Sequence, residues 1–363
     1  MEKKLRIAII GTGGIAHAHA RNYLKIEEVE IVAGADIVPG KARAFLDEFG
    51  LTSAKDFESA EKMLDSLELD AVSVCTYNQT HVECAVAALK RGLPVLLEKP
   101  MCVTMDQAAQ LMRAEKESGT FVSVGFQPRY DPNAVKIKEI VQSGALGDIY
   151  YVQTGGGRRR GMPGGTFIGK DTAGVGALGD IGCYGLDMPL NSLGYPKPLT
   201  VSASAFNKMG KSPVINPDWH DKFEVDDSSV ALIRLEGGIT LDFRMSWAMH
   251  MDSMGATFFL GDKAGLKVMP TTGSKWSGAW DGPVGDITLY HDSFGTQTET
   301  PIPLLQSKVD LFYEKVHAFV EAVKTNGPAP IPTSQIIYNQ AIISGIVESS
   351  AKGREVEIVI PEF

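Results

Sequence analysis

Residues 7–16 are Ile7-Ala8-Ile9-Ile10-Gly11-Thr12-Gly13-Gly14-Ile15-Ala16. The apolar run predicts a first strand, because it is too short for the apolar region of a signal peptide. The glycines match the pattern GxGxxA, which permits a tight turn and lets backbone N–H groups approach a pyrophosphate at a helix N-terminus. Alone this pattern is a weak signal, but here it joins a predicted strand to a predicted helix. We therefore expect Gly11, Gly13, Gly14 and Ile15 to bind a dinucleotide cofactor.

Apolar runs and amphipathic helical stretches alternate over the first third of the chain. The predicted strands are 5–10, 29–35, 71–76, 95–98 and 121–126, and the predicted helices are 15–25, 40–49, 59–65, 81–91 and 105–118. Continuous apolar strands separated by helices indicate a parallel sheet covered on both faces. We therefore expect a doubly wound α/β domain of the Rossmann type over residues 1–127.

The rest of the chain has a different pattern. Strands are predicted at 149–154, 201–206, 229–235, 239–247, 256–261, 265–269 and 286–291, and helices at 132–143, 176–193, 308–325 and 334–351. Turn signals such as Glu236-Gly237-Gly238 separate the strands. Residues 128–363 are therefore expected to form an α+β domain with a large, mainly antiparallel open sheet.

Composition sets broad limits on the class of protein. The 363 residues are 44% hydrophobic, enough for two ordinary cores. The net charge of -9 argues against nucleic acid or an anionic membrane as the main partner. The four cysteines form no CxxC pair, which is typical of reduced thiols in a cytoplasmic protein. No apolar run approaches the length of a transmembrane helix.

Asp36 directly follows the second predicted strand, downstream of the glycine-rich turn. An acidic side chain at this point accepts hydrogen bonds from both hydroxyls of an adenosine ribose and repels a 2′-phosphate. The next residues, Ile37-Val38-Pro39, contain no Ser-Arg pair that would favour the phosphate. The sequence therefore favours NAD over NADP, although a solvated turn aspartate would have the same local sequence.

The tripeptide Glu98-Lys99-Pro100 closes the apolar strand around residues 93–97. Open α/β sheets bind their ligands outside the carboxyl ends of the strands, so Lys99 is expected near the reactive ring of the cofactor. A cation at that point can acidify an alcohol that is about to lose hydride. The pattern therefore indicates a dehydrogenase.

Asp180 and Tyr184 are four residues apart in a glycine-rich stretch, with Asp187 one turn further. In a helix these side chains lie on one face. Each glycine in a helix costs about 1 kcal/mol relative to alanine, so this many glycines indicate close approach to another backbone or to a ligand. The alternative is a packing helix whose polar residues face solvent. His17 and His19, two residues apart, face different sides of their helix and indicate no metal site.

Several further segments occur in a characteristic order. They are Cys75-Thr76-Tyr77-Asn78-Gln79-Thr80-His81, Gly125-Phe126-Gln127-Pro128-Arg129-Tyr130, Gly174-Val175-Gly176-Ala177-Leu178-Gly179-Asp180-Ile181-Gly182, Val225-Asp226-Asp227 and Gly353-Arg354-Glu355-Val356. Together with Glu98-Lys99-Pro100, this order resembles the Gfo/Idh/MocA oxidoreductases nearly end to end.

The resemblance implies that Lys99 is catalytic and that Asp180 and Tyr184 complete the site. Many members have histidine where this chain has Tyr184, so the chain is similar to a tyrosine-bearing branch. A tyrosine with its ordinary pKa near 10 is a weak base at neutral pH. Two roles stay open: Tyr184 accepts the proton with Lys99 lowering its pKa, or it donates a hydrogen bond while Lys99 or a water relays the proton.

The same resemblance assigns further residues to ligand binding. Asn78 and His81 belong to the loop under the nicotinamide, although Asn78 could equally cap a turn. Glu98 is expected to contact the nicotinamide ribose, and Arg129 to touch the cofactor or the substrate. The cofactor set is completed by Thr76 and Gln127.

Two segments are candidates for substrate binding. Arg158-Arg159-Arg160 is either a solvated charge run or an arm that contacts substrate or a neighbouring subunit. Trp219 and His220 combine an aromatic ring with hydrogen-bonding groups, which suits stacking on a sugar. Trp276 and Trp280 are weaker candidates of the same kind.

These observations lead us to expect an NAD-dependent dehydrogenase of a pyranose sugar, a glycoside or a cyclic polyol. One alternative is oxidation of a glycoside at C3, or an NAD-cycling step in glycoside cleavage. Another is a non-catalytic NAD-binding sensor, which the intact set of Lys99, Asp180 and Tyr184 disfavours. A broad open sheet also indicates a homodimer or homotetramer assembled through the second domain.

Overall fold

The computed structural model describes residues 4–270, 285–305 and 309–361, so Trp276 and Trp280 lie outside the described residues. The chain forms two compact units, each described by itself below. The first comprises Met1–Gln127, Val309–Ile337 and Pro361–Phe363, and the second comprises Pro128–Lys308 and Tyr338–Ile360. In the described parts, no helix is long and apolar enough to cross a membrane.

The first unit contains a six-stranded sheet whose pairings are all parallel. Its spatial order is β3 (Lys55–Phe57), β2 (Val29–Ala35), β1 (Leu5–Ile10), β4 (Ala71–Val74), β5 (Val95–Leu97) and β6 (Val122–Val124). The connecting helices are α1 (Gly14–Tyr23), α2 (Lys41–Glu48), α3 (Ala60–Ser66), α4 (His81–Leu89) and α5 (Met105–Ser118). The doubly wound α/β fold is confirmed. The strand order reverses between β1 and β4, which is where such folds bind nucleotides.

Helix α9 (Leu311–Thr325) belongs to the first unit, whereas the sequence pattern predicts a domain of residues 128–363. Val316, Phe319 and Val320 are completely buried in the same core as Ile7 and Tyr23. After α9, the chain runs beside β6, where the Val124 N–H donates to the Ile331 carbonyl. The apolar spacing of α9 predicts a buried face but carries no information on which core that face enters.

The second unit is built on a nine-stranded sheet. Its order is β14 (Thr296–Ile302), β13 (Ile287–Ser293), β12 (Ala264–Val268), β11 (Thr257–Gly261), β7 (Ile149–Gly157), β10 (Thr240–Ser246), β9 (Ser228–Leu235), β8 (Pro198–Phe206) and β15 (Val356–Glu357). Among the described strands, β7 and β10 pair in parallel and the other neighbours are antiparallel. The expected large, mainly antiparallel sheet is therefore confirmed.

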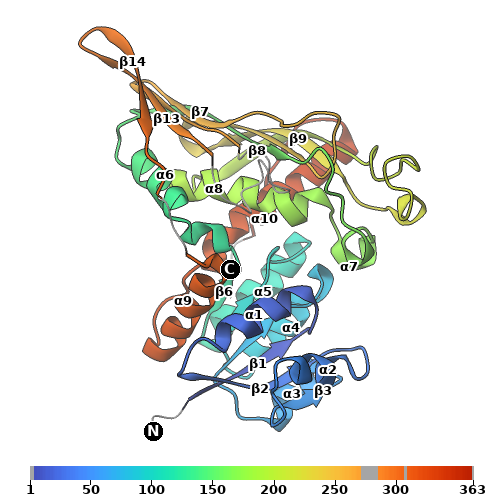
Figure 1. Ribbon diagram of the computed structural model, residues 1–363. Coiled ribbons are helices and arrows are strands. Elements are labelled where there is room, and N and C mark those ends of the chain that lie inside the picture. Colours follow the sequence, from blue (N-terminus) through green and yellow to red (C-terminus); the bar gives the residue numbers. More distant parts are fainter. Residues whose placement is uncertain (1–3, 271–284, 306–308, 362–363) are drawn as a thin grey trace. The chain divides into compact units, whose positions relative to one another are not determined.

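One face of this sheet is covered by helices, as Figure 1 shows for α8 (Cys183–Leu193) and α10 (Thr333–Lys352). The unit also contains α6 (Pro132–Gln142) and α7 (Lys170–Ala173). Val201, Ile233 and Leu241 lie in register on the covered face and are fully buried. On the opposite face, Val230 and Leu232 are exposed. This alternation fixes the register, because a slip by one residue would exchange the two faces.

Candidate active site

The glycine-rich turn follows β1 at the point where the strand order reverses. Gly11 has φ +82°, and a Cβ there would lie 2.7 Å from the backbone nitrogen of Thr76, so only glycine fits. At Gly13 and Gly14, by contrast, a Cβ would meet no heavy atom within 4 Å. This open space lies at the N-terminus of α1, whose first turn carries no acidic residue. The turn therefore fits the pyrophosphate of a dinucleotide.

Asp36 is held in place at the end of β2 and is 8% exposed. The N–H and the hydroxyl of Thr12 both donate to its Oδ2 at 2.9 Å, and the Val38 N–H donates to Oδ1 at 3.0 Å. Lys41 Nζ lies 3.0 Å from the same Oδ2. Burial opposes ionisation, but these donors outweigh it and hold the pKa of Asp36 below its ordinary value. Asp36 is thus an oriented carboxylate linked directly to the glycine-rich turn.

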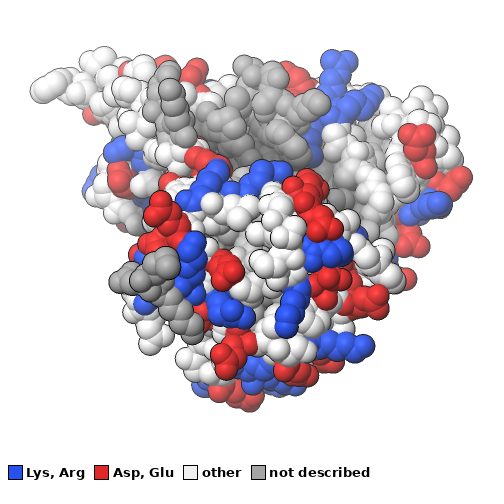
Figure 2. All heavy atoms as spheres, turned by 60° about the horizontal axis from the view of Figure 1, so that its bottom comes forward, with Lys and Arg blue, Asp and Glu red and all other residues white. Residues whose placement is uncertain are grey.

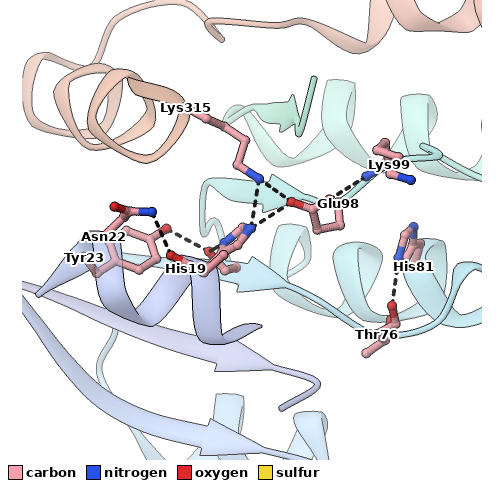
Figure 3. A network of polar contacts seen from close by, with 10 residues as sticks. His19, Asn22, Tyr23, Thr76, His81, Glu98, Lys99 and Lys315 are labelled. Carbon is pink, nitrogen blue, oxygen red and sulfur yellow. Dashed lines mark hydrogen bonds and ion pairs between the residues drawn. The ribbon is translucent and has the colours of Figure 1, made fainter. Parts of the chain in front are cut away.

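His81, at the start of α4, binds the loop that follows β5. Its Nδ1 is 2.7 Å from the Pro100 carbonyl oxygen. Its Nε2 is 3.2 Å from the Thr76 carbonyl oxygen, the contact that Figure 3 draws. Burial lowers the pKa of His81, so we place one proton on the ring, at Nδ1, where the contact is shorter. His81 therefore fixes the loop that carries Lys99. Its predicted place under the nicotinamide, like that of Asn78 in the adjoining turn (Asn78–Thr80), stays a prediction.

Glu98 is buried at the end of β5. Its Oε1 accepts a hydrogen bond from His19 Nε2 at 2.8 Å and also contacts Lys315 Nζ. Its Oε2 faces the Lys99 N–H at 3.3 Å. Burial opposes ionisation, but Lys315 and His19 outweigh it and hold the pKa of Glu98 well below its ordinary value. The contact of Glu98 with the nicotinamide ribose, and the cofactor roles of Thr76 and Gln127, remain predictions.

In the second unit, Asp180 lies on a wide π-helical turn (Leu178–Gly182) that precedes α8, where the sequence predicted one continuous helix. The buried indole of Trp247 donates to Asp180 Oδ2 at 2.9 Å. The start of the turn is fixed by Asp226, whose carboxylate accepts the N–H groups of Gly176 and Leu178. A Cβ at Gly176 would lie 2.0 Å from the Asp226 carbonyl oxygen, so this glycine permits the close backbone approach. Inserted π turns are frequent at functional sites.

Tyr184 occupies the first turn of α8 and is buried. The helix is anchored near this residue by Asn339, which donates to the Cys183 carbonyl at 2.7 Å. One turn further, Asp187 binds Arg129 at both oxygens, at 2.7 and 2.8 Å. Tyr195 completes this buried ion pair through its hydroxyl. Arg129 is thus an internal partner of α8, and its contact with cofactor or substrate stays a prediction.

The candidate substrate residues have different surroundings. Arg158 is buried and continues the pairing of β7 with β10 through its N–H, which donates to Ser246 at 3.0 Å. Arg159 and Arg160, by contrast, are exposed. Trp219 is 37% exposed and packs against Gly164, where a Cβ would lie 2.6 Å from the indole nitrogen. The ring of His220 lies 3.1 Å from Asp221. Substrate binding by Arg158, Trp219 and His220 remains a prediction.

Two residues that contact the candidate site residues, Trp247 and Lys315, were not predicted from the sequence. Trp247 ends a predicted strand, and an aromatic residue there is typical of a core position, so nothing in the pattern indicated a donor to Asp180. Lys315 lies on a helix far along the chain from Glu98, and no local signal connects them. Within the described ranges, no group of three or more His, Cys, Asp or Glu residues is placed to hold a metal ion.

Comparison with known proteins decides the family. The model of an oxidoreductase family with an NAD-binding Rossmann fold, GFO_IDH_MocA, matches residues 5–126, and the model of the GFO/IDH/MocA C-terminal domain matches residues 134–267. The chain is 34% identical over 364 residues to D-glucoside 3-dehydrogenase of Escherichia coli (strain K12), covering 98% of this chain and 97% of the relative. The chain belongs to the Gfo/Idh/MocA family.

Two further similarities extend across this Gfo/Idh/MocA protein. It is 24% identical to scyllo-inositol 2-dehydrogenase (NAD(+)) of Bacillus subtilis (strain 168), covering 92% of this chain and 90% of the relative. A structure of levoglucosan dehydrogenase in complex with NADH shares the fold, with a TM-score of 0.81 at 20% identity, over 98% of this chain and all of that one. The expected family, its enzymatic class and NAD as the cofactor are therefore confirmed.

Proposed function

We propose that this Gfo/Idh/MocA oxidoreductase oxidises a ring carbinol of a pyranose sugar, glycoside or cyclic polyol, with D-glucosides as the first substrate class to test. The observation that carries the proposal is the anchoring of the Lys99 loop at the carboxyl end of β5, in the same unit as the glycine-rich turn and Asp36. The similarity to D-glucoside 3-dehydrogenase, which spans nearly both chains, supports a glucoside and points to C3 as the oxidised carbon.

In the proposed reaction, a carbinol loses a hydride from carbon and a proton from oxygen, and NAD supplies the hydride acceptor. The Lys99 ammonium donates a hydrogen bond to the substrate hydroxyl and stabilises the negative charge that develops on oxygen. Asp180, whose carboxylate is oriented by Trp247, holds the substrate. Tyr184 either accepts the proton as a phenolate, or its hydroxyl donates a hydrogen bond while Lys99 or a water relays the proton.

The test is to incubate the purified protein with NAD and a panel of D-glucosides, free sugars and inositols, and to follow the absorbance of reduced nicotinamide. A sustained rise with one class is expected and identifies the substrate. Oxidation at C3 is then checked by product NMR. Consumption of a glycoside without a rise would support NAD-cycling cleavage instead. No reaction across the panel, with NAD bound, would contradict the proposal and favour a sensor.

Replacing Asp36 by alanine is expected to weaken NAD binding by about tenfold to a hundredfold, because two charge-assisted hydrogen bonds to the ribose are lost. NADP carries a phosphate on this ribose and does not make both hydrogen bonds to Asp36. The ratio of NAD affinity to NADP affinity should therefore fall by a similar factor. Fluorescence titration of the reduced cofactors measures both affinities. Asp47, an exposed carboxylate on α2, gives the matched control Asp47→Ala. An unchanged ratio in Asp36→Ala would remove Asp36 from the ribose site.

We also propose a homodimer or homotetramer formed through the uncovered face of the second unit's sheet. Exposed apolar side chains on that face, including Phe206, Val230 and Leu232, support this. Figure 2 shows a face of the first unit on which Lys and Arg are interspersed with Asp and Glu. A mixed charged surface of this kind does not indicate a subunit interface on that face. Light scattering distinguishes these assemblies from a monomer.

A cytoplasmic location is proposed on the basis of the four free thiols, because disulfides are rare in that compartment.

A further inference from the structure

Three ionisable side chains from distant parts of the chain meet inside the first unit (Figure 3). His19 comes from α1, Glu98 from the end of β5 and Lys315 from α9. The side chains of Lys315, His19 and Glu98 are 1%, 0% and 5% exposed. Lys315 Nζ lies 3.1 Å from His19 Nε2 and also contacts Glu98 Oε1. This buried cluster is separate from the residues to which the proposed function gives chemical roles.

The hydrogen-bond partners of His19 fix where the protons lie. Its Nε2 is 2.8 Å from Glu98 Oε1, which only accepts when ionised, and 3.1 Å from Lys315 Nζ, which only donates. We place the proton of His19 on Nε2 because the contact with the carboxylate is the shorter one. Its Nδ1 is 3.1 Å from Ser73 Oγ and accepts that hydroxyl, and Ser73 in turn accepts from Tyr23 at 2.8 Å. Burial and the Lys315 charge both lower the pKa of His19, in agreement with a neutral ring. The cluster therefore holds one negative charge, on Glu98, and one positive charge, on Lys315.

Glu98 connects the buried cluster to the backbone of Lys99. Its Oε2 faces the Lys99 N–H at 3.3 Å, so the carboxylate binds the backbone from which the Lys99 side chain projects. Gly125 lies directly against the Glu98 carboxylate, because a Cβ at this position would be only 2.9 Å from Oε1. Cys75 and His81 also interact electrostatically with this carboxylate. The Lys315 ammonium contacts the carboxylate directly.

We propose that Lys315 is a positioning residue for Lys99: its charge keeps Glu98 ionised and in place, and Glu98 fixes the backbone of Lys99. This inference rests on the proposed catalytic role of Lys99. Removing one partner of a buried ion pair leaves an uncompensated charge, which is far less favourable than the intact pair. The carboxylate must then move, take up a proton, or draw a proton onto His19. Each of these changes alters the contact with Lys99.

The first test compares Lys315→Met with the wild-type enzyme. The turnover number should fall about tenfold or more, because small displacements of a catalytic group are costly, while the affinity for NAD changes by less than about threefold. Lys315→Arg keeps the charge and should recover most of the turnover. Lys324 lies on the same helix but forms exposed ion pairs, so Lys324→Met is the matched control and should behave as the wild type. Full turnover in Lys315→Met would overturn the inference.

The second test asks whether Lys315 acts through Glu98. In a Glu98→Gln background, Lys315→Met should cost less than about twofold further, because the charge that needs neutralising is already gone. An equal cost in both backgrounds would show that Lys315 acts independently and would overturn the inference. The double variant buries neither charge, so it remains a usable reference even where Lys315→Met alone folds poorly.

The third test observes His19 directly by NMR of the labelled imidazole. In the wild type, the ring should stay neutral with its proton on Nε2 between about pH 5 and 8. In Lys315→Met, His19 should become protonated within that range, since Glu98 then lacks its other cation. An unprotonated His19 in that variant would contradict the charge assignment. If Lys99→Met retains turnover, the proposed catalytic role of Lys99 fails. If the enzyme needs Lys99 but the effects of Lys315→Met and Glu98→Gln are additive, only the positioning role of Lys315 is refuted.

Discussion

Replacing Lys99 by methionine is expected to lower the turnover number about a thousandfold while leaving the affinity for NAD within about threefold of wild type. A side chain that donates to or accepts from the reacting oxygen typically contributes a factor of about 10² to 10⁴. Methionine retains the length and the apolar stem of lysine but cannot donate to a developing alkoxide. The glycine-rich turn and Asp36 are untouched by the change, so the adenosine half of the cofactor keeps its contacts.

Initial rates with saturating NAD and substrate measure the turnover number, and fluorescence titration with NADH measures cofactor affinity. Lys90→Met is the matched control, because Lys90 is exposed at the end of α4 and carries the same charge. Turnover within tenfold of wild type in Lys99→Met would remove Lys99 from the catalytic step. Loss of NADH binding together with turnover would show that Lys99 serves the cofactor instead.

Replacing Phe319 by alanine is expected to lower the free energy of unfolding of the first unit by about 3–5 kcal/mol. Phe319 lies near the C-terminal end of the chain, yet its ring is completely buried and lies 5.9 Å from that of Phe121. Removing it leaves a cavity in the core shared by α1, β1 and α9. Bound NAD should offset part of the loss, because it stabilises the folded first unit by mass action.

Hydrogen exchange measured along the chain shows which unit is affected. The loss of protection should concentrate in residues 4–127 rather than in residues 128–270. Tryptophan fluorescence does not report on this directly, since the tryptophans that the structure describes, Trp219 and Trp247, lie in the second unit. Phe294→Ala is the matched control, because Phe294 is fully exposed in the turn between β13 and β14 and should cost less than about 0.5 kcal/mol. Loss of protection centred on the second unit would contradict the placement of α9.

The parts of the fold that follow from local pattern were predicted from sequence. Continuous apolar strands separated by helices specify the parallel sheet, and the glycine-rich turn specifies where its order reverses. Strand β14 was missed, because Thr296–Ile302 is a polar, largely exposed edge strand that buries no alternating apolar face. The π turn at Leu178–Gly182 was predicted as α-helix, because its wider turn depends on hydrogen bonds from Gly176 and Leu178 to the distant Asp226.

The candidate site divides in the same way. Gly11, Asp36, Lys99 and Asp180 stand at predictable places relative to strand ends and glycines. The partners that orient them are set by long-range packing: Trp247 for Asp180, and Lys315 for Glu98. The sequence spacing of His17 and His19 indicates no site, and the proposed role of His19 depends on partners 54 to 296 residues away. Sequence spacing carries no record of such contacts.

The position of α9 also has a consequence for biosynthesis. A ribosome releases the strands of the first unit long before α9, which follows Gln127 by about 200 residues. At about 5–20 residues per second, that interval lasts about 10–40 s. Throughout it, the apolar surface that Phe319 and Val320 later cover is exposed on the nascent chain, and Glu98 lacks its buried cation. The cofactor-binding unit is therefore the first to be translated but cannot complete its folding until nearly the whole chain has been made.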